Sequence, residues 1–148
     1  MKNLILLTTL FIGLNTFAAN GNPVINAKVL KTFNHVFKDA KNVYWYKHTN
    51  YLQASFTDGD IKTKAYIDSN GQLLQTIRYY KENNLPANVL YKLNKKYSQQ
   101  TIWGVVEVSD NRSTNYHITL KDRNNWYKIQ VTNEGNIVLK KKFKRGDI

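Results

Sequence analysis

The chain has 148 residues, with 22 Lys and Arg against 10 Asp and Glu, and a formal net charge of +12 at pH 7. It contains no cysteine, which excludes disulfides and thiolate metal sites, and its length suits one ordinary domain or two small units sharing a core. Basic charge with 10 Tyr and 3 Trp also describes binders of single-stranded nucleic acid. No RNP-type motif is present and the N-terminus indicates export, so we expect no nucleic-acid partner.

The N-terminus is typical of a secretory signal. Lys2 precedes an apolar run over Leu4–Leu14, and the small residues Thr16 and Ala18 stand where a signal peptidase reads the chain. The run is too short to cross a hydrocarbon layer of about 30 Å as a helix. We therefore expect residues 1–18 to be a signal peptide cleaved near Ala18/Ala19, and no transmembrane segment in the mature chain. Because the chain has no disulfides, the periplasm or surface of a bacterium is the expected location.

The first part of the mature chain has the pattern of one helix and four strands. Asn22-Pro23 resembles a helix cap with a first-turn proline, and apolar residues at helical spacing predict a helix over about residues 24–38. Asp58-Gly59 and Asn70-Gly71 supply the positive φ angles of tight hairpins, so neighbouring strands should be antiparallel. Aromatic and β-branched residues mark the strands Val43–His48, Tyr51–Thr57, Ile61–Asp68 and Leu73–Tyr80.

The same order recurs in the second part of the chain. A polar linker, Lys81–Leu85, leads to a helix expected over about Pro86–Lys96. Four strands are then expected at about Thr101–Val108, Tyr116–Lys121, Trp126–Thr132 and Ile137–Lys144.

The two halves also align in sequence, which indicates a tandem duplication. Ala27–Phe37 matches Ala87–Tyr97 with identical residues at four positions, and Gly71 matches Gly135 in the last hairpin of each half. A repeated pattern implies a repeated supersecondary unit that buries a repeated face. We predict an α+β fold of two tandem helix-plus-four-stranded antiparallel meander repeats (αββββ twice), over residues 19–80 and 81–148. The helices should lie on one face of the sheets, and whether the two sheets join is left open.

Four segments resemble the PepSY-like, β-lactamase-inhibitor-like family of exported bacterial proteins, common in Bacteroidetes. They are Asn42–Tyr46, the hairpin Ala65–Leu73, the helix opening Leu85–Val89 and the turn Asn133–Ile137. The resemblance implies two tandem helix-plus-four-strand units whose sheets form one concave surface. The family's function is largely unassigned; in the β-lactamase inhibitor itself that surface clamps an enzyme, and PepSY domains have been linked to the restraint of peptidases. The inhibitor's cysteines are absent from this chain.

Strand periodicity separates a covered face from a helix-free one. In Ile61–Asp68 the aliphatic Ala65 and Ile67 alternate with Lys64 and Tyr66, which indicates that one side is covered and the other is wet. By the same alternation, Tyr80 should be exposed to solvent and Phe143 should face the core. Amphipathic aromatics beside lysines are typical of binding surfaces, although cross-strand packing would also explain them. The candidate binding residues are Tyr51, Lys64, Tyr66, Arg78, Trp126 and Lys128.

No catalytic residue, metal site or cofactor is predicted. The histidines His35, His48 and His117 fall on different elements and form no i,i+4 pair. The fragment Asp68–Gly71 resembles part of a calcium loop, but Tyr79 stands where the last acidic ligand is expected, so we interpret it as a hairpin turn. No serine lies in a Gly-x-Ser-x-Gly elbow.

We therefore expect an exported, non-catalytic binding or inhibitory module whose helix-free sheet face binds a protein or peptide in the cell envelope. The positive charge favours an acidic partner. The alternative is a cell-envelope structural or adhesive protein that holds anionic glycan or lipid through its basic surface. The run Lys140–Arg145 is the sharpest local charge, and it either serves such binding or keeps an edge strand from further pairing. The partner's identity and the oligomeric state are left open.

Overall fold

The structure, a computed structural model, describes residues 23–146. The predicted signal peptide and its cleavage site lie outside the described residues. Neither helix within residues 23–146 is both long enough and apolar enough to cross a membrane. The elements follow the order α1 (Ala27–Val36), β1 (Lys41–Lys47), β2 (Tyr51–Asp58), β3 (Ile61–Asp68), β4 (Leu73–Tyr80), the 3₁₀ helix η1 (Glu82–Asn84), α2 (Ala87–Lys96), β5 (Thr101–Asp110), β6 (Thr114–Lys121), β7 (Asn125–Thr132) and β8 (Ile137–Lys144).

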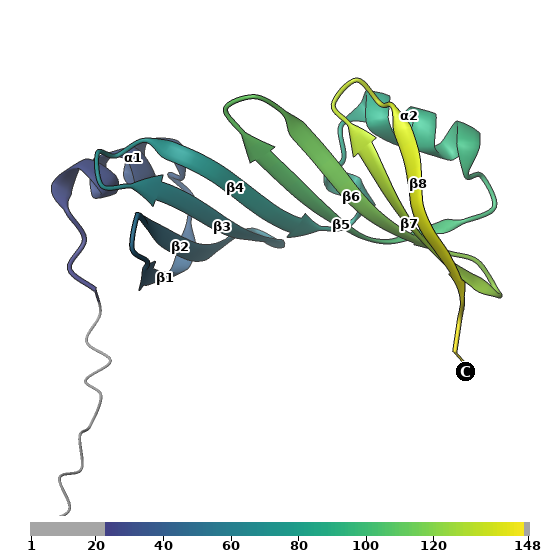
Figure 1. Cartoon of the computed structure of the whole chain (residues 1–148), viewed down its shortest axis with the longest axis horizontal. Coiled ribbons are helices and arrows are strands. Elements are labelled where there is room, and N and C mark those ends of the chain that lie inside the picture. Colours follow the sequence, from purple (N-terminus) through teal and green to yellow (C-terminus); the bar gives the residue numbers. More distant parts are fainter. Residues whose placement is uncertain (1–22, 147–148) are drawn as a thin grey trace, which may run out of the picture.

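All eight strands belong to one sheet, in the order β1 to β8, and every neighbouring pair is antiparallel (Figure 1). The junction between the two halves is the β4–β5 pair, where Arg78 lies opposite Glu107 and Tyr80 lies opposite Val105. The fold is thus α+β, with one continuous eight-stranded antiparallel meander and two helices. The question left open by the sequence is answered, since the strands of the two halves join edge to edge.

The first helix begins later than predicted. Asn26, and not Asn22, is its N-cap, because the Asn26 side-chain oxygen accepts a hydrogen bond from the Val29 backbone N–H at 3.0 Å. Pro23 therefore precedes the helix. The second helix begins at Ala87, directly after Pro86, which is close to the expected start.

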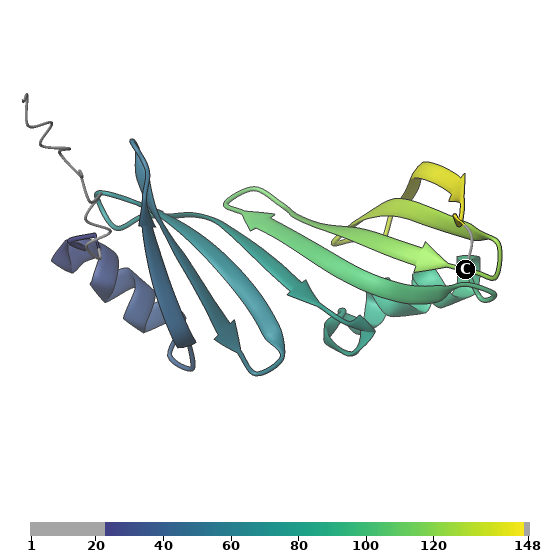
Figure 2. The same cartoon turned by 90° about the horizontal axis from the view of Figure 1, so that it is seen from below.

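Each helix packs on the strands of its own half (Figure 2). From α1, Val29 and Phe33 join a buried cluster with β2 and β3, in which Phe33 and Phe56 meet edge to face at 5.2 Å. From α2, Val89 and Leu93 join a second cluster with β5, β6 and β7. The strand residues of these clusters are Leu52, Ala54, Phe56, Ala65 and Ile67 in the first half, and Ile61, Tyr80, Val105, Tyr116, Ile118, Leu120, Tyr127, Ile129 and Val131 around the second.

The last hairpin turn of each half is tied to the helix of that half. The Asn26 side-chain amide donates to the Ser69 carbonyl at 3.0 Å, and the Asn88 amide donates to the Asn133 carbonyl at 2.9 Å. The Thr32 hydroxyl also donates to the Gly71 carbonyl at 2.6 Å. These contacts fix the tilt of each helix on the sheet at its N-terminal end.

A β-bulge reverses the phase of β4 relative to the prediction. Ile67 lies opposite Leu73, but Tyr66 lies opposite Gln75, so Leu74 is an extra residue. From Gln75 onward each side chain of β4 lies on the opposite side from the one simple alternation predicts. Tyr80, expected to be wet, is therefore buried in the core, with 6% of its surface exposed.

A second bulge reverses the side-chain phase of β8 relative to the prediction. Ile129 lies opposite Leu139 and Lys128 lies opposite Lys141, which leaves Lys140 as the extra residue. Phe143, predicted to point inward, lies opposite Trp126 on the other side of the sheet. The prediction for Phe143 was wrong for the same physical reason as that for Tyr80.

Candidate functional site on the open face of the sheet

We use the term open face for the side of the sheet opposite the buried core residues. Along β3, for example, Lys62, Lys64 and Tyr66 alternate with buried Thr63 and Ala65. Residues directly opposite each other on neighbouring strands share a face, so the register carries the open face across the whole sheet. Its aromatic and cationic strand residues are Lys41, Tyr44, Tyr46, Tyr51, Lys62, Lys64, Tyr66, Tyr79, Trp103, Lys121, Trp126, Lys128, Lys141 and Phe143.

Trp103 and Trp126 meet on the second half of the open face. Trp103 is the extra residue of a bulge in β5, since Ile102 lies opposite Leu120 and Gly104 lies opposite Thr119. Its ring contacts the Trp126 ring edge to face, and 51% of the residue is exposed. A bulge re-aims a side chain, and here it presents a tryptophan to solvent.

Cations surround both indole rings. The Lys121 amino group lies 4.2 Å from the centre of the Trp103 ring, and the Lys81 amino group lies 5.1 Å from it. The Arg145 guanidinium carbon is 5.4 Å from the centre of the Trp126 ring. Cations within about 6 Å of an aromatic face are attracted by its quadrupole. The tryptophan cluster, meaning Trp103, Trp126, Lys81, Lys121 and Arg145, is therefore an aromatic surface with a positive rim.

Tyrosines dominate the first half of the open face. The Tyr51 and Tyr66 rings meet edge to face at 5.5 Å, and His48 stacks on Tyr51 at 4.6 Å. Partial burial, with smaller contributions from Tyr79 and Tyr51, raises the pKa of Tyr66, so its hydroxyl is a neutral donor and acceptor at pH 7. Tyr44 is 64% exposed, so these tyrosines present ring faces and hydroxyl groups to a partner.

The middle of the open face is positively charged because its lysines lie along the strands, whereas the carboxylates on this face, such as Asp68 and Asp110, stand at strand ends. Within residues 23–146 the Asp and Glu residues stand in turns, in η1 or at strand ends, apart from Glu107. Glu107 lies on the core side, opposite Arg78. Asp122 illustrates the turn carboxylates: its side chain accepts hydrogen bonds from the Asn124 and Asn125 N–H groups and from the Tyr127 hydroxyl. Anionic groups are therefore attracted to the middle of the sheet and repelled at its turns.

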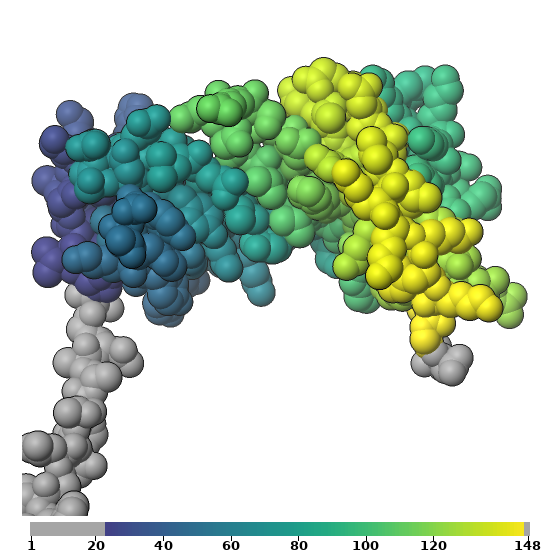
Figure 3. Space-filling view, viewed as in Figure 1, coloured from purple at the N-terminus to yellow at the C-terminus, as the bar shows by residue number. Residues whose placement is uncertain are grey.

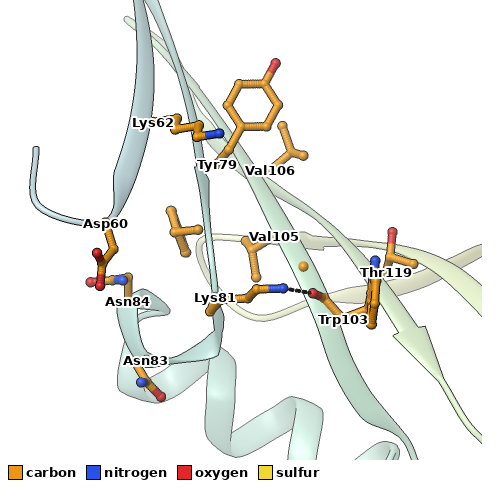
Figure 4. A pocket seen from close by; sticks show the side chains of 12 residues that line it. Asp60, Lys62, Tyr79, Lys81, Asn83, Asn84, Trp103, Val105, Val106 and Thr119 are labelled. Carbon is orange, nitrogen blue, oxygen red and sulfur yellow. Dashed lines mark hydrogen bonds between the residues drawn. The ribbon is translucent and has the colours of Figure 1, made fainter. Parts of the chain in front are cut away.

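A pocket of about 490 Å³ opens at the junction of the two halves (Figure 4). Tyr79 and Trp103 lie on opposite sides of it. Gly104 and Val106, both on β5, also line it. The Lys81 amino group donates a hydrogen bond to the Trp103 carbonyl at 2.8 Å. The remaining lining residues are Asp60, Lys62, Tyr80, Asn83, Asn84, Val105 and Thr119.

The structure groups five of the six predicted binding residues on the open face. Tyr51 and Tyr66 are in contact, and Lys64 lies two residues before Tyr66 on β3. Trp126 and Lys128 lie on β7, in the other half. The predicted set is therefore divided between two regions of one surface.

The sixth residue, Arg78, is not on the open face, so its predicted placement was wrong. The bulge in β4 turns it to the core side, where it lies opposite Thr63 and Glu107. Its guanidinium donates to the Glu107 carboxylate at 3.1 and 3.4 Å, and the Tyr80 hydroxyl donates to the same carboxylate at 2.5 Å. Burial and the hydrogen bond to Glu107 raise the pKa of Tyr80 far above its ordinary value. This cluster satisfies buried polar groups between the two halves.

The sequence-based prediction missed Trp103, Lys81, Tyr44 and Tyr46. Trp103 was hidden by the bulge, because simple alternation along β5 places it on the same side as the buried Val105. Lys81 belongs to a loop, and strand alternation does not predict on which side of the sheet a loop residue lies. Tyr44 and Tyr46 did carry a signal, since they alternate with Val43 and Trp45, which pack on the first core. Two-residue alternation in β1 alone would have identified them.

Within residues 23–146, no group of three or more His, Cys, Asp or Glu side chains is arranged to hold a metal ion. His117 lies on β6 opposite Val106 and Gln130, and His48 stacks on Tyr51. The open face therefore offers aromatic surface, lysine cations and hydroxyl groups, which are groups that bind other molecules.

Comparison with solved structures places this fold among known ones. A BLIP-like protein from Bacteroides fragilis superimposes with a TM-score of 0.63 at 19% identity, covering 86% of this chain and 92% of that chain. The fold is BLIP-like. A DUF2874 family protein from Bacteroides ovatus gives a TM-score of 0.59 at 19% identity, covering 82% and 89% of the two chains. A candidate periplasmic protein from Bacteroides eggerthii gives 0.58 at 14% identity, covering 82% and 90%.

No protein-family model and no curated protein sequence matches the chain. The resemblance proposed from sequence is confirmed at the level of the BLIP-like fold and its occurrence in Bacteroides proteins. At these identities the likeness concerns the fold, and the function must be argued from the residues of this chain.

Proposed function

We propose that the protein is an exported, non-catalytic binding or inhibitory module that captures an acidic protein or peptide partner on the open face. The observation that carries this proposal is the distribution of side chains: exposed aromatics and lysines share one face along the strands, whereas the carboxylates stand in turns, in η1 or at strand ends, apart from Glu107 on the core side. Export rests on the N-terminal pattern over residues 1–18, with cleavage near Ala18/Ala19. A location in the periplasm or at the cell surface follows from that pattern and suits a BLIP-like fold.

Stabilisation of the sheet is a simpler explanation for the aromatics, and it accounts for part of them. Tyr51 with Tyr66, and Trp103 with Trp126, are cross-strand contacts that stabilise a sheet by about 0.2–1 kcal/mol each. It does not account for Tyr44 and Tyr46, each of which is more than half exposed. Exposed large aromatics beside cations are enriched at protein interfaces.

We also propose that the two halves are tandem copies of one unit, residues 19–80 and 81–148, with both helices on one side of the sheet. Supporting observations are a bulge in the last strand of each half, β4 and β8, and the equivalent hydrogen bonds of Asn26 and Asn88 to the last turn of each half. Two helices on one side leave the whole of the other side available to a single partner. The space-filling view shows the two halves joined as one elongated body (Figure 3).

The test is capture of a partner from periplasmic extract by the mature protein, with cross-linking and mass spectrometry. Replacing Tyr66 and Trp126 together by Ala should abolish capture while the melting temperature stays within a few degrees of the original. The matched control is Tyr91→Ala, because Tyr91 is an exposed tyrosine of α2, 67% accessible and off the open face. Equal capture by the double variant, or equal loss with Tyr91→Ala, would contradict the proposal.

A second candidate function is binding of anionic glycan or lipid in the cell envelope. Lys140, Lys141, Lys142 and Lys144 on the edge strand β8 favour it, since they concentrate positive charge at one end of the sheet. Salt separates the two functions. Charge-driven binding to isolated envelope material should disappear by about 0.5 M salt, whereas a shape-matched protein interface should largely persist.

A further inference from the structure

The pocket at the β4–β5 junction has a glycine, Gly104, in its wall. A Cβ atom built on Gly104 would meet no other atom within 4 Å, so the space above it is empty. Gly104 also lies outside the positive-φ region that favours glycine, whereas Gly59, Gly71 and Gly135 lie inside it. Neither the backbone nor the packing therefore requires a glycine here.

A glycine inside a strand costs stability, roughly 0.5–1 kcal/mol relative to a residue with a side chain. Such a glycine often marks a bulge or a place where a ligand or another backbone comes close. The position of Gly104 fits this explanation, since it lies in the pocket wall on the open face, opposite Thr119 and next to the Trp103 bulge. A larger side chain at this position would fill the pocket.

The lining of the pocket combines flat apolar surface with positive charge. Tyr79 and Trp103 supply two aromatic rings and Val106 adds an aliphatic wall, while Lys62 and Lys81 supply two ammonium groups. Lys81 donates one hydrogen bond, to the Trp103 carbonyl, and an ammonium group has three donors. Within residues 23–146 Lys62 forms no ion pair.

One carboxylate, Asp60, is also part of the lining. Figure 4 places Asp60 beside Asn84 at one side, whereas Lys62 extends along the Tyr79 ring and Lys81 points to Trp103. The formal charge of the lining is therefore positive on the side where the aromatic rings lie. A volume of about 490 Å³ falls within the range of roughly 300–1,000 Å³ typical of small-molecule sites.

We propose that this pocket binds a small aromatic anion, with the ring of the ligand against Tyr79 and Trp103 and its negative charge attracted by the ammonium groups of Lys62 and Lys81, one at each side of the pocket. The pocket is part of the open face, but its binding of a small anion does not depend on the capture of a protein partner by that face. A planar apolar body suits the two rings, and a carboxylate complements the two ammonium groups. A neutral aromatic compound can also contact the two rings, but it has no negative charge to interact with the ammonium groups.

The experiment uses 1-naphthoate as the probe and 1-naphthalenemethanol as its neutral counterpart, with the mature protein. The chain has 3 Trp, so the indole N–H signals in a ¹⁵N NMR spectrum are few, and a Trp103→Phe variant assigns the one from Trp103. We expect 1-naphthoate to shift the Trp103 signal saturably, with a dissociation constant below about 1 mM. The neutral compound should bind about tenfold more weakly.

Two kinds of variant locate the site. Gly104→Phe should fill the pocket and abolish the shift, while Gln130→Phe adds the same ring elsewhere on the open face and should leave it unchanged. Lys62→Gln with Lys81→Gln should weaken binding of 1-naphthoate by about tenfold and leave the neutral compound nearly unaffected. This double variant adds no bulk to the pocket, so it tests the proposal even where Gly104→Phe alters the fold.

The proposal is overturned by absence of a saturable shift up to about 5 mM 1-naphthoate. It is also overturned when 1-naphthoate and 1-naphthalenemethanol bind equally well, or when binding survives in the folded Gly104→Phe variant. None of these outcomes bears on capture of a protein partner, which is measured with Tyr66 and Trp126 replaced.

Discussion

The indole rings of Trp103 and Trp126 meet edge to face on the open face, with their centroids 5.5 Å apart and their planes at 80°. Trp103 comes from a bulge in β5 and Trp126 from β7, so the contact spans β6, where Lys121 lies beside the Trp103 ring. The two rings therefore both stabilise the second half of the sheet and present aromatic surface to solvent.

The contact between these rings should be measurable as a coupling energy. Edge-to-face pairs contribute about 0.5–1.5 kcal/mol beyond their buried area. We expect a double-mutant cycle with Trp103→Ala and Trp126→Ala to give a coupling in that range, measured as free energy of unfolding in urea. Additive effects of the two substitutions would mean that the rings act independently.

The two turn glycines should differ in how costly they are to replace. Both have positive φ, +86° at Gly71 and +82° at Gly135, so alanine costs about 1–2 kcal/mol at either position from backbone conformation alone. An added Cβ at Gly71 would lie 2.9 Å from the Lys28 carbonyl oxygen, which belongs to the backbone of α1. At Gly135 it would meet the flexible side chain of Lys92, which can move away.

We therefore expect Gly71→Ala to lower the free energy of unfolding by about 1 kcal/mol more than Gly135→Ala. Urea unfolding of the two single variants gives the comparison directly. Each glycine serves as the matched control for the other, because the two stand at equivalent turns. An equal loss at both positions would show that helix α1 moves as easily as a lysine side chain.

Glu107 should be important for the stability of the fold. Its carboxylate accepts from Arg78 and from Tyr80, and the residue is buried at the junction of the two halves. Glu107→Ala leaves the Tyr80 hydroxyl without its acceptor, and an unsatisfied buried group costs about 1–3 kcal/mol. We expect a loss of this size in thermal or urea unfolding. The control Glu82→Ala, in exposed η1, should stay within about 0.5 kcal/mol.

Asp122 should contribute to the acid sensitivity of the fold. The hydrogen bond from the Tyr127 hydroxyl, assisted by backbone N–H groups of Asn124 and Asn125, holds the pKa of Asp122 well below its ordinary value of 3.8. The stabilisation is present above pH 3.8 and is lost as the pH falls below it, because the unfolded chain takes up the proton first.

Replacing Asp122 by Asn should therefore lower stability at pH 7 and make it less dependent on pH below 3.8. The measurement is urea unfolding between pH 7 and pH 2 for the original protein and the variant. Asp39→Asn, in the exposed segment after α1, is the control. If the free energy of unfolding of Asp122→Asn falls at low pH as steeply as that of the original protein, other carboxylates determine the acid sensitivity.

Local pattern was sufficient for the elements of this fold. The strands Ile61–Asp68, Leu73–Tyr80 and Ile137–Lys144 have the predicted bounds, and the helix predicted at Pro86–Lys96 begins one residue later. These features depend on side-chain periodicity and turn residues within a few positions of one another, which a single sequence displays. The open-face positions of Tyr51, Lys64, Tyr66, Trp126 and Lys128 followed from the same alternation.

The sequence by itself thus determined the order of elements and the facing of regular strands. Only the tertiary structure decided that the halves share one sheet, that Arg78 and Tyr80 face the core, and that Phe143 and Trp103 face outward. The physical reason is that a bulge is a property of two strands together: one extra residue relative to a partner reverses every later side chain, and no local period records it.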